Sequence, residues 1–214
     1  MPRKLLFVTV DSITLTTNGE PPNVNDNAVK YAMMATMLYP RSGAPTVTSA
    51  LPVRELARGT NDLAPLGFFG NGLFKEEVQD STLLNVKVVN RQETSKIEKF
   101  IVTLFATILG AGLGVVTGGL TGVLGAVSAF GVDALKGGLK SAGDDEVVTI
   151  GETNNIPIQI AEIGPVPLVR DYDLILKEDV VSRFIDPQTR QVATYTITAG
   201  GNGSIRLRMW TEEL

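Results

Sequence analysis

The chain of 214 residues contains no cysteine and no histidine. Without thiols or imidazoles it can form no disulfide, no zinc site built from those ligands, and no catalytic arrangement that relies on a cysteine or on imidazole. Carboxylates, lysines and hydroxyls remain, and they form no recognisable catalytic constellation. We therefore predict that the protein is not an enzyme, has no catalytic residues, and uses no cofactor or metal.

Basic residues are few and scattered, with 19 Lys and Arg against 23 Asp and Glu and a net charge of −4. Because neither a basic stripe nor an RNA- or DNA-reading motif is present, nucleic acid is not an expected partner. No signal peptide is recognisable, since Met1-Pro2-Arg3-Lys4 leads into only about six apolar-leaning residues before Asp11. The expectation is cytoplasmic synthesis, followed by membrane association or by release through a route that needs no signal peptide.

Charged side chains are absent from the 33 residues 100–132, and four glycines recur there at every fourth position: Gly110, Gly114, Gly118 and Gly122. A period of four aligns them along one side of a helix, where the lack of side chains lets a second helix approach closely. This pattern predicts a helix-packing surface, a glycine zipper, and with it a homo-oligomer.

Two free-energy contributions oppose each other in this run of residues. Its eight glycines would destabilise a water-exposed helix by about 8 kcal/mol relative to polyalanine. Its sixteen Leu, Ile, Val and Phe residues would contribute on the order of 5 to 10 kcal/mol in lipid. Because the two quantities nearly cancel, we expect membrane insertion to be conditional.

The pair Gly118-Gly119 divides the run into arms 100–117 and 120–134, each shorter than the roughly 20 residues that span a bilayer. A helical hairpin is therefore expected, with a single long helix as the competing geometry. The predicted membrane-facing residues are Leu104, Phe105, Ile108, Leu109, Leu113, Leu120, Val123 and Leu124. The predicted headgroup-binding residues are Lys96, Lys99, Lys136 and Lys140. The alternative is that the run packs in protein, on its own domain or on sister chains.

Elsewhere apolar residues alternate with a period of two, as in Leu6, Val8 and Val10, which is typical of half-buried strands. The same alternation appears around residues 84–88 and 205–209. Further strands are expected at 29–38, 46–51, 147–150, 156–160 and 192–198. Short strands separated by turns predict an antiparallel β-sandwich of about eight strands. The expected organisation is a sandwich in two parts, 1–94 and 143–214, with a hydrophobic helical insertion at 95–142.

Four segments resemble the C2-like family of lipid-binding, eight-stranded sandwiches. They are 4–10, 81–92, 144–158 and 203–210, and they resemble the opening strand, the two flanks of the third membrane-facing loop, and the closing strand. The resemblance implies that the apolar run is inserted in a loop that this family turns toward membranes. Asn90 and Gln92 stand where calcium-binding members carry aspartates, and Asp144 and Asp145 alone supply too little charge, so calcium binding is not expected.

Two remaining groups have structural interpretations. The carboxylates of Asp171, Asp173, Glu178 and Asp179 are expected in a solvated loop beside a strand. On the final strand, Arg206 and Arg208 are expected to face solvent and Trp210 to close one edge of the sandwich.

The function that these patterns favour is that of a non-enzymatic, membrane-interacting or pore-forming protein that self-associates through its glycine-zipper insertion. Its expected partners are other copies of itself and anionic lipid membranes. The alternative is a structural, self-assembling subunit of a shell, tube or ring, in which the apolar helices pack against neighbouring subunits.

Overall fold

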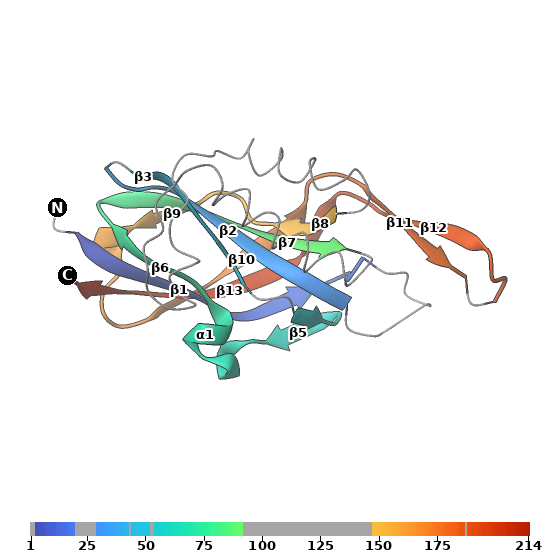
Figure 1. Cartoon of the computed structure of the whole chain (residues 1–214), viewed down its shortest axis with the longest axis horizontal. Helices are drawn as coiled ribbons and strands as arrows, with labels where there is room; N and C mark the ends of the chain where they lie inside the picture. The colour runs from blue at the N-terminus through green and yellow to red at the C-terminus, as the bar shows by residue number, and fades with distance from the viewer. Residues whose placement is uncertain (1–2, 20–28, 43, 52–53, 92–146, 187) are drawn as a thin grey trace, which may run out of the picture.

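The computed structural model describes residues 3–19, 29–42, 44–51, 54–91, 147–186 and 188–214, and these are mainly β-structure (Figure 1). The strands are β1 (Lys4–Leu15), β2 (Val29–Arg41), β3 (Ala44–Ala50), β4 (Arg54–Leu56), β5 (Gly59–Asp62), β6 (Gly72–Val78), β7 (Ser81–Arg91), β8 (Val147–Glu152), β9 (Ile156–Gln159), β10 (Leu168–Leu176), β11 (Val180–Ile185), β12 (Val192–Ile197) and β13 (Gly200–Glu213). The helices of the described residues are the single turns η1 (Ala64–Leu66), α1 (Phe68–Asn71) and η2 (Ile160–Glu162).

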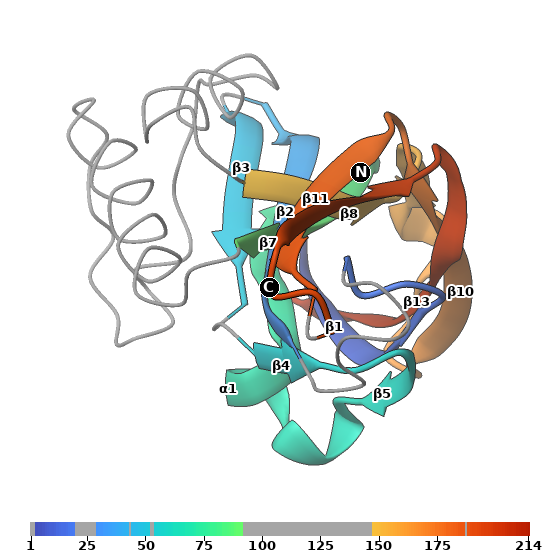
Figure 2. The same cartoon turned by 90° about the vertical axis from the view of Figure 1, so that its right-hand side faces the viewer.

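Eleven strands form one sheet in the order β3-β2-β7-β8-β10-β13-β1-β5. In addition β4 pairs with β2, β6 pairs with β1, and β9 pairs with β7. Every pair is antiparallel. Seen along its length, the sheet curls so that its two flanks face each other across a common interior (Figure 2). The two termini lie at one end of the molecule and the paired strands β11 and β12 project from the other (Figure 1).

The core fills the inside of this curled sheet. From one flank, β1 and β13 contribute Leu6, Val8, Val10, Ile205, Leu207 and Met209. From the other, β2 and β7 contribute Met33, Ala35, Met37, Leu84, Val86 and Val88. All twelve belong to one cluster of buried side chains, so a single core holds both flanks together.

A bulge in β1 changes which residues reach the core. The register against β13 shifts between Val10 and Ser12, and the positions of β1 that belong to the core cluster change from even numbers, ending at Val10, to odd numbers at Ile13 and Leu15. An extra residue in one strand moves every later side chain to the opposite face. Asp11 is the residue at this shift, and its carboxylate accepts hydrogen bonds from Arg208.

The prediction of a mainly β, antiparallel fold is confirmed, and strands lie in each of the predicted ranges. The predicted number of strands was too low, since thirteen are described, and Ile160 begins η2 instead of ending β9. The loop interpretation of Asp171 and Asp173 is wrong, because both lie in β10. In β10 only Leu174 and Leu176 are buried while the preceding residues are more exposed, so the strand lacks the alternation that reveals β1.

The strands β11 and β12 form a separate two-stranded sheet, the arm, which pairs from Val180 with Ile197 to Ile185 with Val192. Among the described strands, none pairs with either of them except the other. Val181 and Val192 are 57% and 73% exposed, so the arm presents apolar side chains to solvent.

Candidate functional site

The residues that the sequence predicts as the functional site all lie in segment 92–146, outside the described residues. These are the glycine row, the eight membrane-facing side chains and the four headgroup-binding lysines named above. What the structure does describe is the place where this segment is attached. The candidate site is therefore built from the strands at its two ends and from the surface beside them.

Strands β7 and β8 carry the two attachment points of segment 92–146. Arg91 ends β7, Val147 begins β8, and these two residues are direct partners in the antiparallel ladder. The ladder continues away from them through Asn90 with Val148 and Val89 with Thr149. The chain thus leaves the sheet and returns to it at adjacent positions, and we call the paired strands β7 and β8 the stem.

A buried carboxylate joins the stem to the neighbouring strand. Glu152, at the end of β8, accepts a hydrogen bond of 2.8 Å from Lys177 Nζ and one of 3.1 Å from Asn85 Nδ2. Its second oxygen lies 3.3 Å from Lys87 Nζ. Because Lys87 and Asn85 are in β7 and Lys177 directly follows β10, these four residues, the Glu152 cluster, connect three elements.

Burial and the neighbouring lysines shift the pKa of Glu152 in opposite directions. Burial raises the pKa of the carboxyl, but the hydrogen bond from Lys177 and the charges of Lys87 and Lys177 outweigh burial and lower it below its ordinary value of 4.5. A carboxylate stabilised by two ammonium groups remains ionised in the folded protein. The cluster consequently acts as an ionic clamp on the stem near neutral pH.

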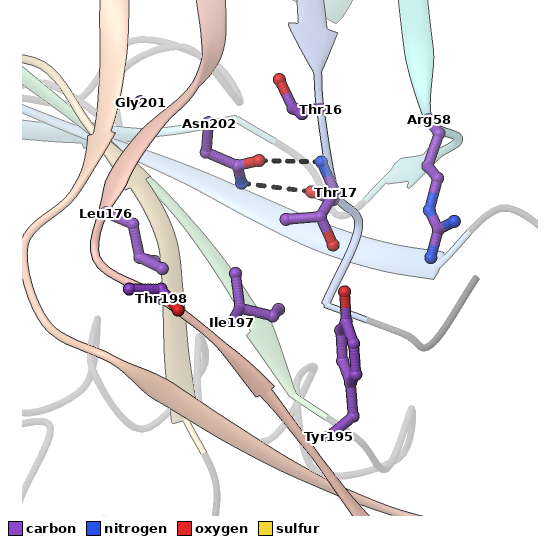
Figure 3. Close-up of a pocket in the computed structure, with 9 residues that line it drawn as sticks. All are labelled: Thr16, Thr17, Arg58, Leu176, Tyr195, Ile197, Thr198, Gly201 and Asn202. Carbon is purple, nitrogen blue, oxygen red and sulfur yellow. Dashed lines mark hydrogen bonds between the residues drawn. The ribbon is translucent and has the colours of Figure 1, made fainter.

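A pocket of about 250 Å³ lies beside the arm, which contributes Tyr195 and Ile197 to its lining (Figure 3). The lining residues come from the end of β1, the turn before β5, the end of β10, the second strand of the arm, and the start of β13. They are Thr16, Thr17, Arg58, Leu176, Tyr195, Ile197, Thr198, Gly201 and Asn202. Among the described residues that line it there are hydroxyl groups, an amide, one guanidinium and two aliphatic side chains, and no carboxylate.

Asn202 fixes the wall of this pocket against the stem. Its side chain donates to the carbonyls of Thr17 and of Ile150 in β8, and accepts a hydrogen bond from Thr17 N. Gly203 follows with a φ of +123°, and a Cβ at this position would collide with the carbonyl of Thr14. Glycine is required there so that β13 can approach β1 closely enough for the Asn202 bonds to form.

The acidic residues singled out in the sequence do not converge on a site. Asp171 is paired with Arg206 through hydrogen bonds of 2.8 and 2.9 Å, and the hydrogen bond from Arg206 lowers the pKa of this exposed carboxyl. Asp179 accepts a hydrogen bond from the backbone of Ala199. Within the described part of the chain, no group of three or more acidic side chains is placed to hold a metal ion. Asp144, Asp145 and Gln92 lie outside the described residues.

The interpretation of Trp210 as an edge residue is wrong. Its strand, β13, lies between β10 and β1 inside the sheet, and its ring stacks on Phe7 with centroids 4.8 Å apart. Arg206 is solvent-exposed as expected, whereas Arg208 is partly exposed and holds Asp11 through three hydrogen bonds of 2.7 to 3.0 Å. These groups stabilise the outer face of β1 and β13, which is a structural role.

No protein-family model matches the chain, and no match to a curated protein was found. Among the residues that the structure describes, no helix is long and apolar enough to cross a membrane.

Sequence reasoning missed both the Glu152 cluster and the pocket. The charges of Lys87 and Glu152 were visible, but nothing local to either strand indicates that they are cross-strand partners. The pocket residues come from segments far apart in sequence and carry no motif. A usable signal existed only at Gly200-Gly201-Asn202-Gly203, where a glycine-rich turn opens the final strand.

Proposed function

We propose that this protein engages and permeabilises membranes through segment 92–146, which self-associates, and that the curled sheet is the scaffold that presents this segment. The observation that carries the proposal is the insertion of 33 consecutive uncharged residues between two strands whose ends are already paired. A run that served only to connect β7 and β8 would not need this length, because antiparallel partners can be joined by a two-residue turn.

In this mechanism the row Gly110, Gly114, Gly118 and Gly122 makes the contacts between helices. The larger apolar residues of the run face lipid, and the lysines on either side bind anionic headgroups. The resemblance to the C2-like family belongs to the same proposal, because under that resemblance the junction of β7 and β8 would correspond to the loop that this family turns toward membranes.

The Glu152 cluster supports the proposal from the scaffold side. It joins β7, β8 and Lys177, which follows β10. Lys87 lies four residues before Arg91, where the chain leaves the sheet, and its ladder partner Glu152 lies five residues after Val147, where the chain returns. A stem held in register by ion pairs to the buried Glu152 carboxylate can present a long, apolar segment without that segment contributing to the core. The scaffold and the membrane-active segment are thus separable in this account.

A second candidate is the structural, self-assembling subunit, and the arm favours it. Val181 and Val192 are exposed on a two-stranded sheet that has open edges among the described strands, and such edges pair readily with other chains. In this candidate, segment 92–146 packs against neighbouring subunits and never meets lipid.

Liposome flotation distinguishes the two candidates. The full chain should float with vesicles that contain anionic lipid, and a variant in which residues 95–142 are replaced by a short Gly/Ser turn should stay at the bottom of the gradient. A third variant, with Lys96, Lys99, Lys136 and Lys140 changed to Gln, keeps the apolar run and should lose mainly the preference for anionic lipid. Equal flotation of the full chain and the deletion variant, or flotation of neither, would rule out the membrane function.

A further inference from the structure

We infer that the outer face of β2 and β3, together with the end of β7, is a docking surface, and that its occupant in water is segment 92–146 of the same chain. Only the release of the segment into a membrane rests on the function proposed above. We call this surface the β2–β3 face. Its members are Met34, Thr36, Thr46, Thr48, Ala50 and Val89.

Strand β2 is buried on both of its sides. Successive side chains of a strand point to opposite faces of the sheet, and Met33, Ala35 and Met37 belong to the core inside the curl. The residues between them, Met34 and Thr36, therefore point outward, yet they are only 2% and 7% exposed. The outward-pointing residues of β3 are buried to the same degree.

The β2–β3 face is continuous and lies outside the core. Met34 pairs with Ala50 and Thr36 with Thr48 across the two strands, so these side chains are neighbours. Val89 of β7 lies diagonally beside Met34, because the ladder pairs residue 34 of β2 with residue 87 of β7. Met34, Ala50 and Val89 are buried but do not belong to the core cluster, so something other than the core covers them.

The outer face of the opposite flank is open by comparison. In β13, which lies across the curl from β2 (Figure 2), buried residues alternate with Arg206, Arg208 and Trp210, which are exposed or partly exposed. Strand β3 is the last in the order of the sheet, a position where strands are usually less protected than in the middle. The burial of its outer side is therefore not a consequence of its place in the sheet.

The described strands with extensive contacts to β2 or β3 do not form a layer over this face. Besides each other, β2 and β3 mainly contact β4, β6 and β7. Strands β4 and β7 pair with β2 along its edges. Strand β6 pairs with β1, and its Leu73 and Val78 belong to the core inside the curl.

Composition selects segment 92–146 as the occupant. The β2–β3 face carries no charged side chain, and apolar surface is best covered by another apolar surface. The two longest stretches outside the described residues are 20–28 and 92–146. The first carries Glu20 and Asp26 and has Val24 as its only large aliphatic residue, whereas the second contains 33 consecutive uncharged residues.

Position and length also agree with this occupant. Val89 is two residues before Arg91, where segment 92–146 leaves the sheet, so the segment starts at the border of the face. The two predicted helical arms, 100–117 and 120–134, would measure about 22 to 27 Å. The stretch 46–50 of β3 measures about 14 to 17 Å, so either arm is long enough to cross the face.

Docking on this face would keep the apolar run away from water until a membrane is present. In the proposed membrane mechanism the segment leaves the face and inserts in lipid. Because the members of the face lie outside the core cluster, removal of the segment leaves the core intact.

Thiol labelling tests the docked state without any membrane, since the chain contains no cysteine of its own. Thr48→Cys should react slowly with a maleimide in the full chain. The rate should rise about tenfold or more when residues 95–142 are replaced by a short Gly/Ser turn, because the thiol becomes exposed. Val181→Cys, on the exposed surface of the arm, is the reference for fast labelling in both backgrounds.

The matched control is Ser49→Cys, at the next residue of the same strand. Ser49 pairs with the core residue Ala35 and is fully buried, so its thiol should stay protected with and without the segment. Equal rises at the two positions would show that the segment supports the core and would overturn the docking inference. Thermal melts check that each variant is folded, and Thr46→Cys on the same face replaces Thr48→Cys if the latter does not melt cooperatively.

Protein concentration identifies the occupant. Protection by the chain's own segment should not change on dilution, whereas protection that disappears on dilution would assign the face to a second copy and overturn the inference. Thr48→Cys that labels as fast as Val181→Cys in the full chain, or that stays protected after replacement of 95–142, would also overturn it.

The result is separable from that of flotation. Flotation of the full chain with Thr48→Cys unprotected overturns docking alone and leaves the membrane function standing. Protection that is relieved by replacement of 95–142, without flotation of the full chain, upholds docking while overturning the membrane function.

Discussion

The stem and the arm are both antiparallel strand pairs near the same end of the molecule, but they are held in different ways. The stem lies inside the sheet, with β2 on one side and β10 on the other, and its Val86, Val88 and Ile150 are fully buried. The arm is a sheet of two strands, and Val181 and Val192 face solvent. Neighbouring strands, more than the β-propensity of the pair itself, decide how much of each pair is buried.

This difference suits different tasks. The stem can carry a long apolar segment because its own stability comes from the core and from the Glu152 cluster. The arm has few contacts to lose, so it can adjust to a ligand or a partner at little cost in stability. The predictions below are ordered from the largest expected effect to the smallest.

Self-association should depend on the segment that the stem carries and not on the arm. Changing Gly114 and Gly118 together to Leu should abolish chemical crosslinking into oligomers, because leucine side chains block the close approach of two helices. Leucine also raises helix propensity by about 1 kcal/mol per site, so a weaker helix cannot explain the loss.

The control for this experiment is the pair Gly112→Leu and Gly119→Leu, which a helix would place on the side opposite the four-residue row and which should crosslink like the parent. Oligomers that persist in Gly114→Leu/Gly118→Leu, or that disappear when Val181 and Val192 are changed to Ser, would move the contact from the glycine row to the arm.

Removing the ionic clamp should destabilise the sheet more than removing a surface ion pair. Glu152→Ala leaves the partly buried Lys87 without its carboxylate partner, and we expect the free energy of unfolding to fall by about 2 kcal/mol in urea titrations. Asp171→Ala breaks the exposed pair with Arg206 and should cost about 1 kcal/mol or less. Equal losses in the two variants would show that the Glu152 cluster is not a clamp.

Acid should remove the contribution of Glu152. Its pKa in the folded protein is lowered, so the unfolded chain takes up the proton first, and the stabilisation present above pH 4.5 is lost as the pH falls through the folded value. The difference in free energy of unfolding between the parent and Glu152→Gln should therefore shrink on acidification.

Glu76 provides an opposing contribution. Burial raises its pKa despite the ion pair with Arg41, so its contribution favours the folded state most at low pH and is lost as the pH rises through the folded value. Comparing the parent with Glu152→Gln cancels this contribution, since Glu76 is present in both. A parent-to-variant difference that grows below pH 4.5 would contradict the assignment for Glu152.

The smallest effect is expected in the arm. Val181→Ser and Val192→Ser change side chains that are already 57% and 73% exposed, so the free energy of unfolding should shift by no more than about 0.5 kcal/mol. The matched comparison is Val88→Ser in the stem, where a fully buried side chain is truncated and made polar, and where urea titration should show a loss of about 2 kcal/mol or more.

The sequence predicts strongly patterned strands well and long-range pairing poorly. The alternation of Leu6, Val8 and Val10 locates β1, but the bulge at Asp11, which changes the buried parity, depends on the partner strand β13. Strand β10 escaped detection because its exposed half carries charges and its buried half is short. The alternation of apolar residues indicates the structure of one strand at a time, whereas a bulge and the order of strands depend on how two strands pair.

The candidate site also depends on contacts between residues far apart in sequence, which the sequence alone does not predict. Asn85 and Glu152 are 67 residues apart in sequence, and only the strand order brings them together. The pocket is lined by Arg58 and by four other stretches of chain that are separate in sequence, so no local pattern could reveal it. By contrast, the uncharged run and its glycine row are local features, which is why the sequence alone suggests them.

The central claim is that β7 and β8 close the sheet at Arg91 and Val147 by themselves, so that the apolar segment is an addition to a complete scaffold. Circular dichroism and thermal melting of the variant with residues 95–142 replaced by a short Gly/Ser turn test this most directly. Because closing a shorter loop changes the entropy of the unfolded chain only slightly, we predict the β-sheet signal and cooperative melting of the parent. Loss of the β-sheet signal and of the cooperative transition would contradict the claim and make the segment part of the core.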